Sequence, residues 1–210
     1  MPHVVLIGDS IFDNGAYTRG GPDVISQVRA LLPDGWHGTL IAVDGSTTEE
    51  ITGQLDRVPS DATHLVLSVG GNNALMQLGI LDISVSSMTM AIETLANVAS
   101  AFEARYRSCV AACLKVGLPL AVCTIYNGSF EDLAFQRIAS TTLTVFNDAI
   151  MRVALEHGLA VIDLRSVCAA REDYANPIEP SSVGGEKIAR AIVGLVCREQ
   201  RGPGTWLVGS

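Results

Sequence analysis

Short apolar runs alternate with longer amphipathic stretches along the whole chain. The apolar runs are rich in β-branched residues and nearly continuous, as expected for strands of a parallel sheet that is buried on both faces. They predict five strands, at residues 3–7, 39–43, 64–69, 118–125 and 159–163. The amphipathic stretches predict five helices, at residues 23–32, 48–57, 88–116, 133–157 and 183–198. This alternation predicts an α/β fold, in which right-handed βα units cover a parallel sheet with helices.

The predicted helix at residues 88–116 has the clearest period, because apolar side chains recur every three or four residues on one face. Its start is expected at Ser86 or Ser87, either of which can cap the free N–H groups. Two cysteines on the apolar face are four residues apart and could bind a metal. Because no His or carboxylate shares their turn, we expect them to pack in the core instead. The face consists of Ile92, Leu95, Val98, Phe102, Tyr106, Cys109, Cys113 and Val116.

Length and composition predict one globular domain that spans residues 1–210. The chain has 210 residues, of which 48% are hydrophobic and 17% are charged, so it can form a sizeable core. The segment at residues 199–210 contains Gly and Pro, which oppose a helix. Trp206 could pack over the sheet edge or against a partner, or this tail could be loose.

Charge and cysteine content narrow the function classes. Lys and Arg number 14 against 22 Asp and Glu, for a net charge of −8, which opposes binding of nucleic acid. No apolar stretch reaches the roughly 18 residues of a membrane span, and we expect no signal peptide. The five cysteines form no CxxC pair, which is typical of reduced thiols. We therefore expect a cytoplasmic protein that binds neither nucleic acid nor membrane; its oligomeric state stays open.

Several common site motifs are absent from the sequence. There is no GxxxxGK[ST], no GxGxxG after a strand, no HExxH and no GxSxG, so nucleotide and zinc-protease sites lose their support. The four histidines have no metal-ligand spacing. We expect neither a cofactor nor a metal. These histidines are His3, His37, His64 and His157.

Polar residues follow three of the predicted strands, at residues 8–14, 44–47 and 70–73. In an open parallel sheet, the loops after the strands converge on one ligand crevice. Gly8 permits a tight exit from the first strand, which places Ser10 near free backbone N–H groups and suits a nucleophile. The backbone N–H groups of Ser10 and Gly45, with the Asn72 amide, would form a three-donor oxyanion hole. Each loop alone is ordinary turn chemistry, but the three together favour acyl transfer.

These loops resemble those of the SGNH (GDSL) hydrolases, which are serine esterases and lipases, and the resemblance covers nearly the whole chain. Residues 8–10 (Gly-Asp-Ser) resemble the family's first block, Gly45 its second-block glycine and residues 70–73 its GxND block. The resemblance implies a flavodoxin-like three-layer α/β/α sandwich, with five parallel strands in the order 2-1-3-4-5. Asn73 replaces the family's usual Asp, and Asp13 stands where the family often has an acidic residue.

The family's last block, D-x-x-H-P, aligns with residues 176–180, which read Asn-Pro-Ile-Glu-Pro. Glu179 occupies the position of the general-base His, and Asn176 that of the Asp. A carboxylate can serve as the base if burial raises its pKa from about 4.3 toward the working pH. We hypothesise that Ser10 is the nucleophile, that Glu179 is its base, and that Asn176 orients Glu179 through an amide N–H.

Two other functions stay open. Glu179 could mark lost catalysis, which would leave a binding module whose oxyanion pocket holds an acyl or anionic ligand. A flavodoxin-like nucleotide or phosphate binder could use residues 8–14, but it leaves Asn72 and Gly45 without a role.

Four further residues are candidates for the site. Asp173 is an alternative acid or base; if it is only a cap or a surface charge, its mutation should cost little. Tyr17, Tyr126 and Tyr174 could line an acyl pocket. Because the chain has no long lid insertion, we expect the substrate to be a small-molecule ester with a short acyl group.

Overall fold

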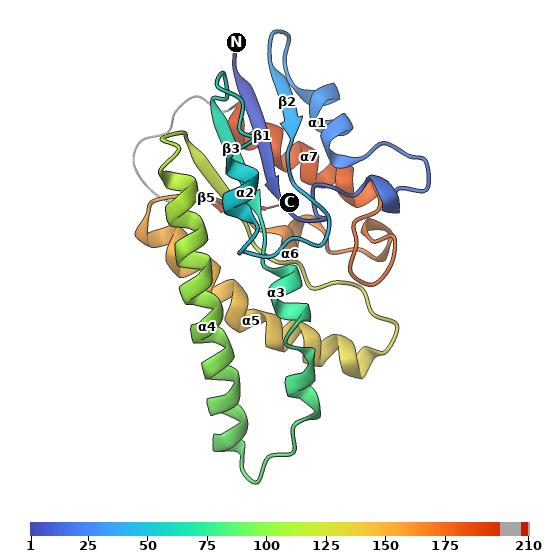
Figure 1. Ribbon diagram of the computed structural model, residues 1–210. Coiled ribbons are helices and arrows are strands. Elements are labelled where there is room, and N and C mark those ends of the chain that lie inside the picture. Colours follow the sequence, from blue (N-terminus) through green and yellow to red (C-terminus); the bar gives the residue numbers. More distant parts are fainter. Residues whose placement is uncertain (198–206, 210) are drawn as a thin grey trace.

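The computed structural model describes residues 1–197 and 207–209, which form a three-layer α/β/α sandwich (Figure 1). The strands are β1 (His3–Gly8), β2 (His37–Leu40), β3 (His64–Ser68), β4 (Leu120–Cys123), β5 (Ala160–Ile162) and β6 (Leu207–Val208). The α-helices are α1 (Val24–Leu31), α2 (Ile51–Leu55), α3 (Gly71–Leu75), α4 (Met88–Leu114), α5 (Leu133–Glu156), α6 (Leu164–Val167) and α7 (Ser182–Val196). Within these described residues there are also three short 3₁₀ helices: η1 (Gly15–Tyr17), η2 (Leu78–Asp82) and η3 (Arg171–Asp173).

The sheet is parallel throughout and has the strand order β2-β1-β3-β4-β5-β6. The predicted order 2-1-3-4-5 is therefore confirmed, but the prediction of five strands is wrong by one. The additional strand is β6, which pairs with β5 at the edge of the sheet. This strand belongs to the segment at residues 199–210, for which the sequence is compatible with either a packed or a loose tail. Trp206 and the rest of residues 198–206 lie outside the described part of the chain.

Both faces of the sheet are buried, which explains the near-continuous apolar runs of the strands. Val5 and Ile7 of β1 join the core on the side of α4 and α5, whereas Val4 and Leu6 join the core on the side of α1 and α7. This division follows the alternation of side chains along a strand. All four side chains are fully buried.

Helix α4 begins where the sequence predicts and reaches beyond the sheet. The Ser87 side chain accepts a hydrogen bond from the Met90 N–H and caps the helix. Cys109 and Cys113 lie in the core, as expected. The predicted apolar face is buried only in the second half of the helix, because Ile92 in the first half is 60% exposed. The first turns of α4, η2 and the segment between them extend away from the sheet (Figure 1). We call residues 76–92, which include several exposed hydrophobic side chains, the apolar arm.

Several predicted boundaries move. Strand β2 ends at Leu40 rather than at residue 43, because Ile41 and Ala42 both donate their N–H groups to the carbonyl of Leu6 and so leave the ladder. The helix predicted at residues 48–57 is shorter in the structure, where α2 extends only over Ile51–Leu55. Two residues separate the end of β3 from helix α3, which begins within the segment where the sequence predicts a loop. Within the described ranges, no helix combines the length and the apolar character that a membrane span requires.

Candidate active site

Gly8 brings the first loop of the site against β3. Its φ is +136°, and a Cβ at this position would lie 1.8 Å from the carbonyl oxygen of Ser68, so only glycine fits. The next residue, Asp9, donates its N–H to the same oxygen over 3.1 Å. Ser10 follows with only 7% of its surface exposed. The tight strand exit predicted for Gly8 is therefore confirmed.

Gln54 of α2 holds this exit in place and was not foreseen from the sequence. Its Oε1 accepts the Gly8 N–H over 2.8 Å, and its Nε2 donates to the Gly8 carbonyl over 2.7 Å. The same Nε2 donates to the Ser46 hydroxyl over 3.1 Å. One buried amide thus connects the first loop to the second. A buried glutamine in a short helix has no distinctive spacing, so no pattern in the sequence signals it.

Asn72, in the first turn of α3, connects the segment after β3 to the second loop. Its Nδ2 donates to the carbonyl of Ser46 over 2.9 Å, which leaves the second N–H of the amide for another acceptor. Gly45 precedes Ser46 and has a φ of +79°, with open space on its Cβ side. The predicted donors at residues 45 and 72 therefore lie on the second loop and on α3, which are hydrogen-bonded to each other.

Asn73, which stands in place of the family's Asp, has a structural role. Its Oδ1 accepts the backbone N–H of Thr48 over 3.1 Å, and its Nδ2 donates to the Thr48 hydroxyl over 3.1 Å. Its Nδ2 also donates to the carboxylate of Glu49 over 3.3 Å. A carboxylate at position 73 would face that of Glu49, so the amide avoids a like-charge contact.

Glu179 lies on a turn that four hydrogen bonds hold. Asn176 accepts the N–H groups of Ile178 and Glu179 on its Oδ1, each over 2.9 Å. The carbonyl of Glu179 accepts the N–H of Ala175 over 2.9 Å, and the Tyr126 hydroxyl donates to the carbonyl of Ile178 over 2.6 Å. The Asn176 oxygen thus shapes the backbone turn, because an Asx residue readily bonds backbone groups two and three residues ahead. That its amide N–H orients the Glu179 carboxylate stays a prediction.

Burial dominates the electrostatics of Glu179. It raises the pKa of Glu179 to about 7, while a hydrogen bond with the Ser10 side chain lowers it and the charge of Asp44 raises it further. Its Oε2 has no hydrogen-bond partner among the described residues. This pKa is close to the ordinary pKa of histidine, about 6.5, so the carboxyl group can exchange protons near neutral pH.

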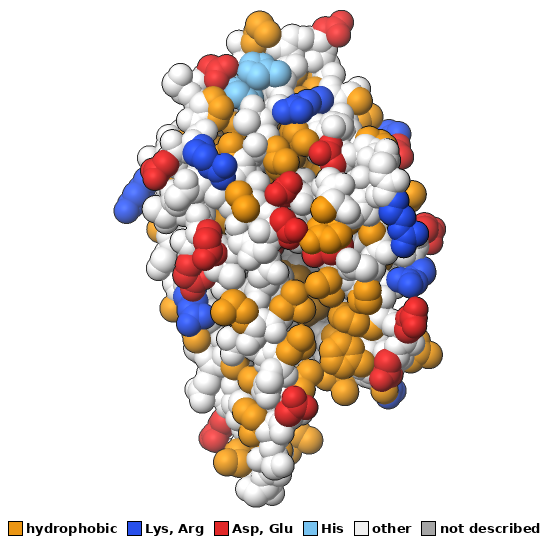
Figure 2. Space-filling view, turned by 45° about the vertical axis from the view of Figure 1, so that its right-hand side comes forward, with side chains coloured by type: hydrophobic (Ala, Val, Ile, Leu, Met, Phe, Trp, Pro, Cys, Tyr) orange, Lys and Arg blue, Asp and Glu red, His pale blue; other side chains and the backbone are white. Residues whose placement is uncertain are grey.

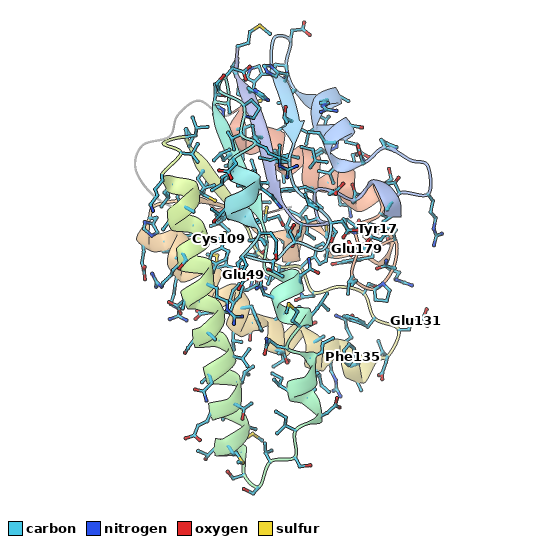
Figure 3. All side chains as sticks on the ribbon, in the orientation of Figure 1. Tyr17, Glu49, Cys109, Glu131, Phe135 and Glu179 are labelled. Carbon is cyan, nitrogen blue, oxygen red and sulfur yellow. The ribbon has the colours of Figure 1, made fainter. Side chains whose placement is uncertain are left out.

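Asp9 and Tyr17 lie in the electrostatic field of Glu179. Burial raises the pKa of Asp9 to about 8, and the charge of Glu179 adds to this shift. The Tyr17 hydroxyl donates to Asp44 over 2.7 Å, and this bond raises the pKa of Tyr17 to about 12. Figure 3 shows Tyr17 and Glu179 close together. Burial therefore favours the protonated form of Asp9, which adds no second charge beside Glu179.

An apolar cavity opens at Ser10 and runs between η2 and α5. Ser10, Asn72 and Glu179 line one end, and hydrophobic side chains surround the hollow in Figure 2. The cavity volume is about 130 Å³, where one water needs about 10–15 Å³. Its apolar walls include Ile11, Leu75, Leu78, Ile80, Leu81, Ile125, Phe130, Phe135, Leu143, Phe146 and Ile178.

The other predicted site residues have mixed outcomes. Tyr126 lines the cavity. Tyr174 packs edge-on against Tyr126, with ring centroids 5.0 Å apart, and its hydroxyl donates to the carbonyl of Cys168. Asp173 is fully buried and forms a 2.6 Å ion pair with Lys187. It does not line the cavity, so its position favours a structural role over that of an acid or base.

Comparison with known proteins identifies the family. The family model described as GDSL-like lipase/acylhydrolase matches residues 6–184. The chain belongs to the GDSL-like lipase/acylhydrolase family. This GDSL-like chain finds no match among curated proteins. Its family membership supports an esterase, lipase or acylhydrolase function.

Solved structures share the fold of this GDSL-like protein at low sequence identity. An extracellular lipase from Streptomyces rimosus is 16% identical, with a TM-score of 0.67 over 93% of this chain and 98% of the lipase. The lipase Lip_vut3 from a goat rumen metagenome is 18% identical, with a TM-score of 0.70 over 90% and 95%. Axe2, an acetylxylan esterase from Geobacillus stearothermophilus, is 18% identical, with a TM-score of 0.61 over 94% of each chain.

Proposed function

We propose that the protein hydrolyses small carboxylic esters, with Ser10 as nucleophile and Glu179 as general base. The observation that carries this proposal is the pairing of Ser10 with a buried Glu179 whose pKa is raised to about 7. An ordinary glutamate accepts protons poorly at neutral pH, whereas a base with a pKa near the working pH is effective. Family membership supports the ester-hydrolase class.

The reaction follows the two-step chemistry of serine esterases. Glu179 takes the proton of the Ser10 hydroxyl as its Oγ attacks the ester carbonyl carbon. Collapse of the tetrahedral intermediate breaks the bond to the alcohol oxygen, and protonated Glu179 gives its proton to that leaving group. Water then attacks the acyl-Ser10 ester, with Glu179 again taking the proton. The carboxylic acid leaves, and Ser10 recovers its hydrogen.

The oxyanion hole is proposed at the N–H groups of Ser10 and Gly45 and the Asn72 amide. The hydrogen bond from Asn72 to Ser46 supports this, because it fixes the amide at the cavity wall while its second N–H stays available. The φ of +79° at Gly45 supports a backbone that a ligand can approach. Each such donor typically contributes about 10²–10³ in kcat.

The size of the apolar cavity allows acyl groups longer than the short acyl group that we expect from the sequence. An acetyl group would fill only part of this cavity of about 130 Å³. Leu78 and Leu81 come from the apolar arm and Phe135 from α5 (Figure 3), so the walls beyond Ser10 suit an aliphatic chain. We therefore include linear acyl groups of about four to eight carbons in the proposed substrate class.

A covalent label tests the proposal directly. A fluorophosphonate should modify one serine of the native protein, and peptide mass spectrometry should place the adduct on Ser10. The Ser10→Ala variant should stay unlabelled, and Glu179→Gln should react at least 100-fold more slowly. Labelling that is absent, or equal in Ser10→Ala, would contradict the assignment and would favour a binding module.

A further inference from the structure

A second group of reactive side chains lies at the end of the sheet opposite Ser10. His3 begins β1, His37 begins β2, and Asp61 precedes β3. The parallel register places His3 directly opposite His37. Their rings lie side by side with centroids 3.9 Å apart. Figure 2 shows histidine atoms at the molecular surface, at the end remote from the apolar arm.

The carboxylate of Asp61 faces both rings. Its Oδ1 is 3.0 Å from Nδ1 of His3, and its Oδ2 is 3.3 Å from Nε2 of His37. All three potential ligand atoms lie within 4.8 Å of one another. Ligand atoms around a tetrahedral zinc ion, with bonds of about 2.0–2.2 Å, lie about 3.4 Å apart. We propose that His3, His37 and Asp61 bind a divalent zinc ion.

Neighbouring groups hold His3 in the orientation that such a site needs. The His3 ring is only 3% exposed, and its Nε2 lies 2.8 Å from the Thr39 hydroxyl. Imidazoles that bind a metal commonly use their other ring nitrogen for a hydrogen bond, which fixes the tautomer. When Nε2 donates to Thr39, Nδ1 carries the lone pair that faces Asp61, and a cation between Nδ1 and Oδ1 would replace the hydrogen bond that these two atoms form without it.

The three ligand atoms determine which class of metal ion the site prefers. Two imidazole nitrogens and one carboxylate oxygen suit Zn²⁺, whereas Mg²⁺ and Ca²⁺ prefer oxygen alone. The side chains of His37 and Asp61 are 40% and 63% exposed, so an ion can enter from solvent and water can complete its coordination. Residues 3, 37 and 61 are more than 20 positions apart along the chain, and for this reason spacing in the sequence does not reveal the group.

The zinc ion would join β1, β2 and the segment before β3. An ion that binds the folded state and not the unfolded chain raises the stability of the fold. Because Ser10 lies beyond the other end of β1, the ion should change thermal stability without taking part in ester hydrolysis. This inference therefore stands or falls independently of the proposed function.

Titration calorimetry of the chelator-treated full chain with Zn²⁺ at pH 7.5 tests the site. We expect one ion per chain with a dissociation constant in the micromolar range, and a rise in Tm of several degrees at saturation. Co²⁺ should give visible absorption bands of a low-coordinate site. His37→Ala and Asp61→Asn should weaken Zn²⁺ binding at least tenfold. His157→Ala, which removes an exposed histidine elsewhere, and Ser10→Ala should bind as the native protein does.

The result that overturns the proposal is no binding up to 1 mM Zn²⁺, or unchanged affinity in His37→Ala and Asp61→Asn. Both variants alter exposed side chains, and Asp61→Asn keeps oxygen and nitrogen atoms for hydrogen bonds. Their metal-free Tm should therefore stay within about 2 °C of the native value. If His37→Ala lowers that Tm further, the affinity of Asp61→Asn decides.

Discussion

Asn14 donates a hydrogen bond of 3.2 Å from its Nδ2 to the carbonyl oxygen of Pro180. Its Oδ1 accepts the N–H of Val24 over 2.9 Å, and the side chain is fully buried. These two bonds join the loop of Ser10 to the residue that directly follows Glu179. The distance between nucleophile and base therefore depends on a side chain that touches neither.

Replacing Asn14 should impair both stability and turnover. Asn14→Ala leaves the buried Val24 N–H and Pro180 carbonyl without partners, which costs about 1–3 kcal/mol each, and it frees the turn of Glu179. We expect urea unfolding to show a loss of at least about 2 kcal/mol, and kcat to fall more than KM changes. Asn97→Ala, on the exposed surface of α4, is the matched control. Unchanged kcat in Asn14→Ala would show that the hydrogen bond from Asn14 to Pro180 does not set the geometry of the active site.

Asp9 should make the protein less stable as the pH rises. Because burial raises its pKa to about 8, the folded state favours the protonated form. This contribution is fully present below about pH 4 and is lost as the pH rises through about 8. Asp9→Asn imitates the protonated group, so its Tm should exceed that of the native protein increasingly from pH 5 to pH 9.

The expected gain from Asp9→Asn at pH 9 is about 2–5 kcal/mol, on the scale of 1.36 kcal/mol per pKa unit. Asp148→Asn, at an exposed carboxylate of α5, should show no such trend. A difference in Tm between Asp9→Asn and the native protein that does not change with pH would show that Asp9 is already ionised in the folded state.

Lys187 should be required for stability because it neutralises a fully buried carboxylate. Lys187→Met leaves Asp173 charged and unpaired, which should cost about 2–4 kcal/mol. Arg190→Met breaks the exposed pair with Glu186 and should cost about 0.5 kcal/mol. Asp173→Asn should lower the free energy of unfolding and leave the pH dependence of kcat/KM in place. Loss of turnover without loss of stability would instead make Asp173 an acid or base.

The apolar cavity should set the preferred acyl length. With p-nitrophenyl esters, kcat/KM should rise from acetyl to hexanoyl as each buried methylene contributes up to about 0.8 kcal/mol. Ala139 of α5 lines the cavity, so Ala139→Phe should reduce hexanoyl turnover at least tenfold and spare acetyl turnover. Ala134→Phe, on the exposed side of α5, is the control. Equal rates for all chain lengths would place the acyl group elsewhere.

The α/β class, the strand order and the loops of the site could be predicted from the sequence. The periodicity of hydrophobic residues reflects burial, and it therefore predicts β1 and the buried second half of α4 well. Ser10 and Asn72 follow from the positions of loops after strands, and Glu179 follows from the resemblance of residues 176–180 to the family's last block; all three line one cavity. The roles of Gly8 and Ser87 follow from local backbone chemistry, which depends on few neighbours.

The remaining features depend on contacts between distant residues. Gln54 and Asn14 act across 46 and 166 positions of the chain, and no spacing rule connects them to their partners. Strand β6 is a two-residue addition to a sheet edge, too short for a periodic pattern. The contact of the Asn176 oxygen with the N–H groups of Ile178 and Glu179 depends on the backbone turn, which the sequence does not show.

The pH dependence of kcat/KM with a p-nitrophenyl ester, from pH 4 to pH 9, tests the central claim that Glu179 is the base. Because the base must be ionised, kcat/KM should rise about tenfold per pH unit below pH 7 and level off above it. Glu179→Gln should lose at least about 10³-fold, and Ser10→Ala should equal the background rate. Native kcat/KM in Glu179→Gln, or a profile that is flat between pH 5 and pH 8, would contradict the account.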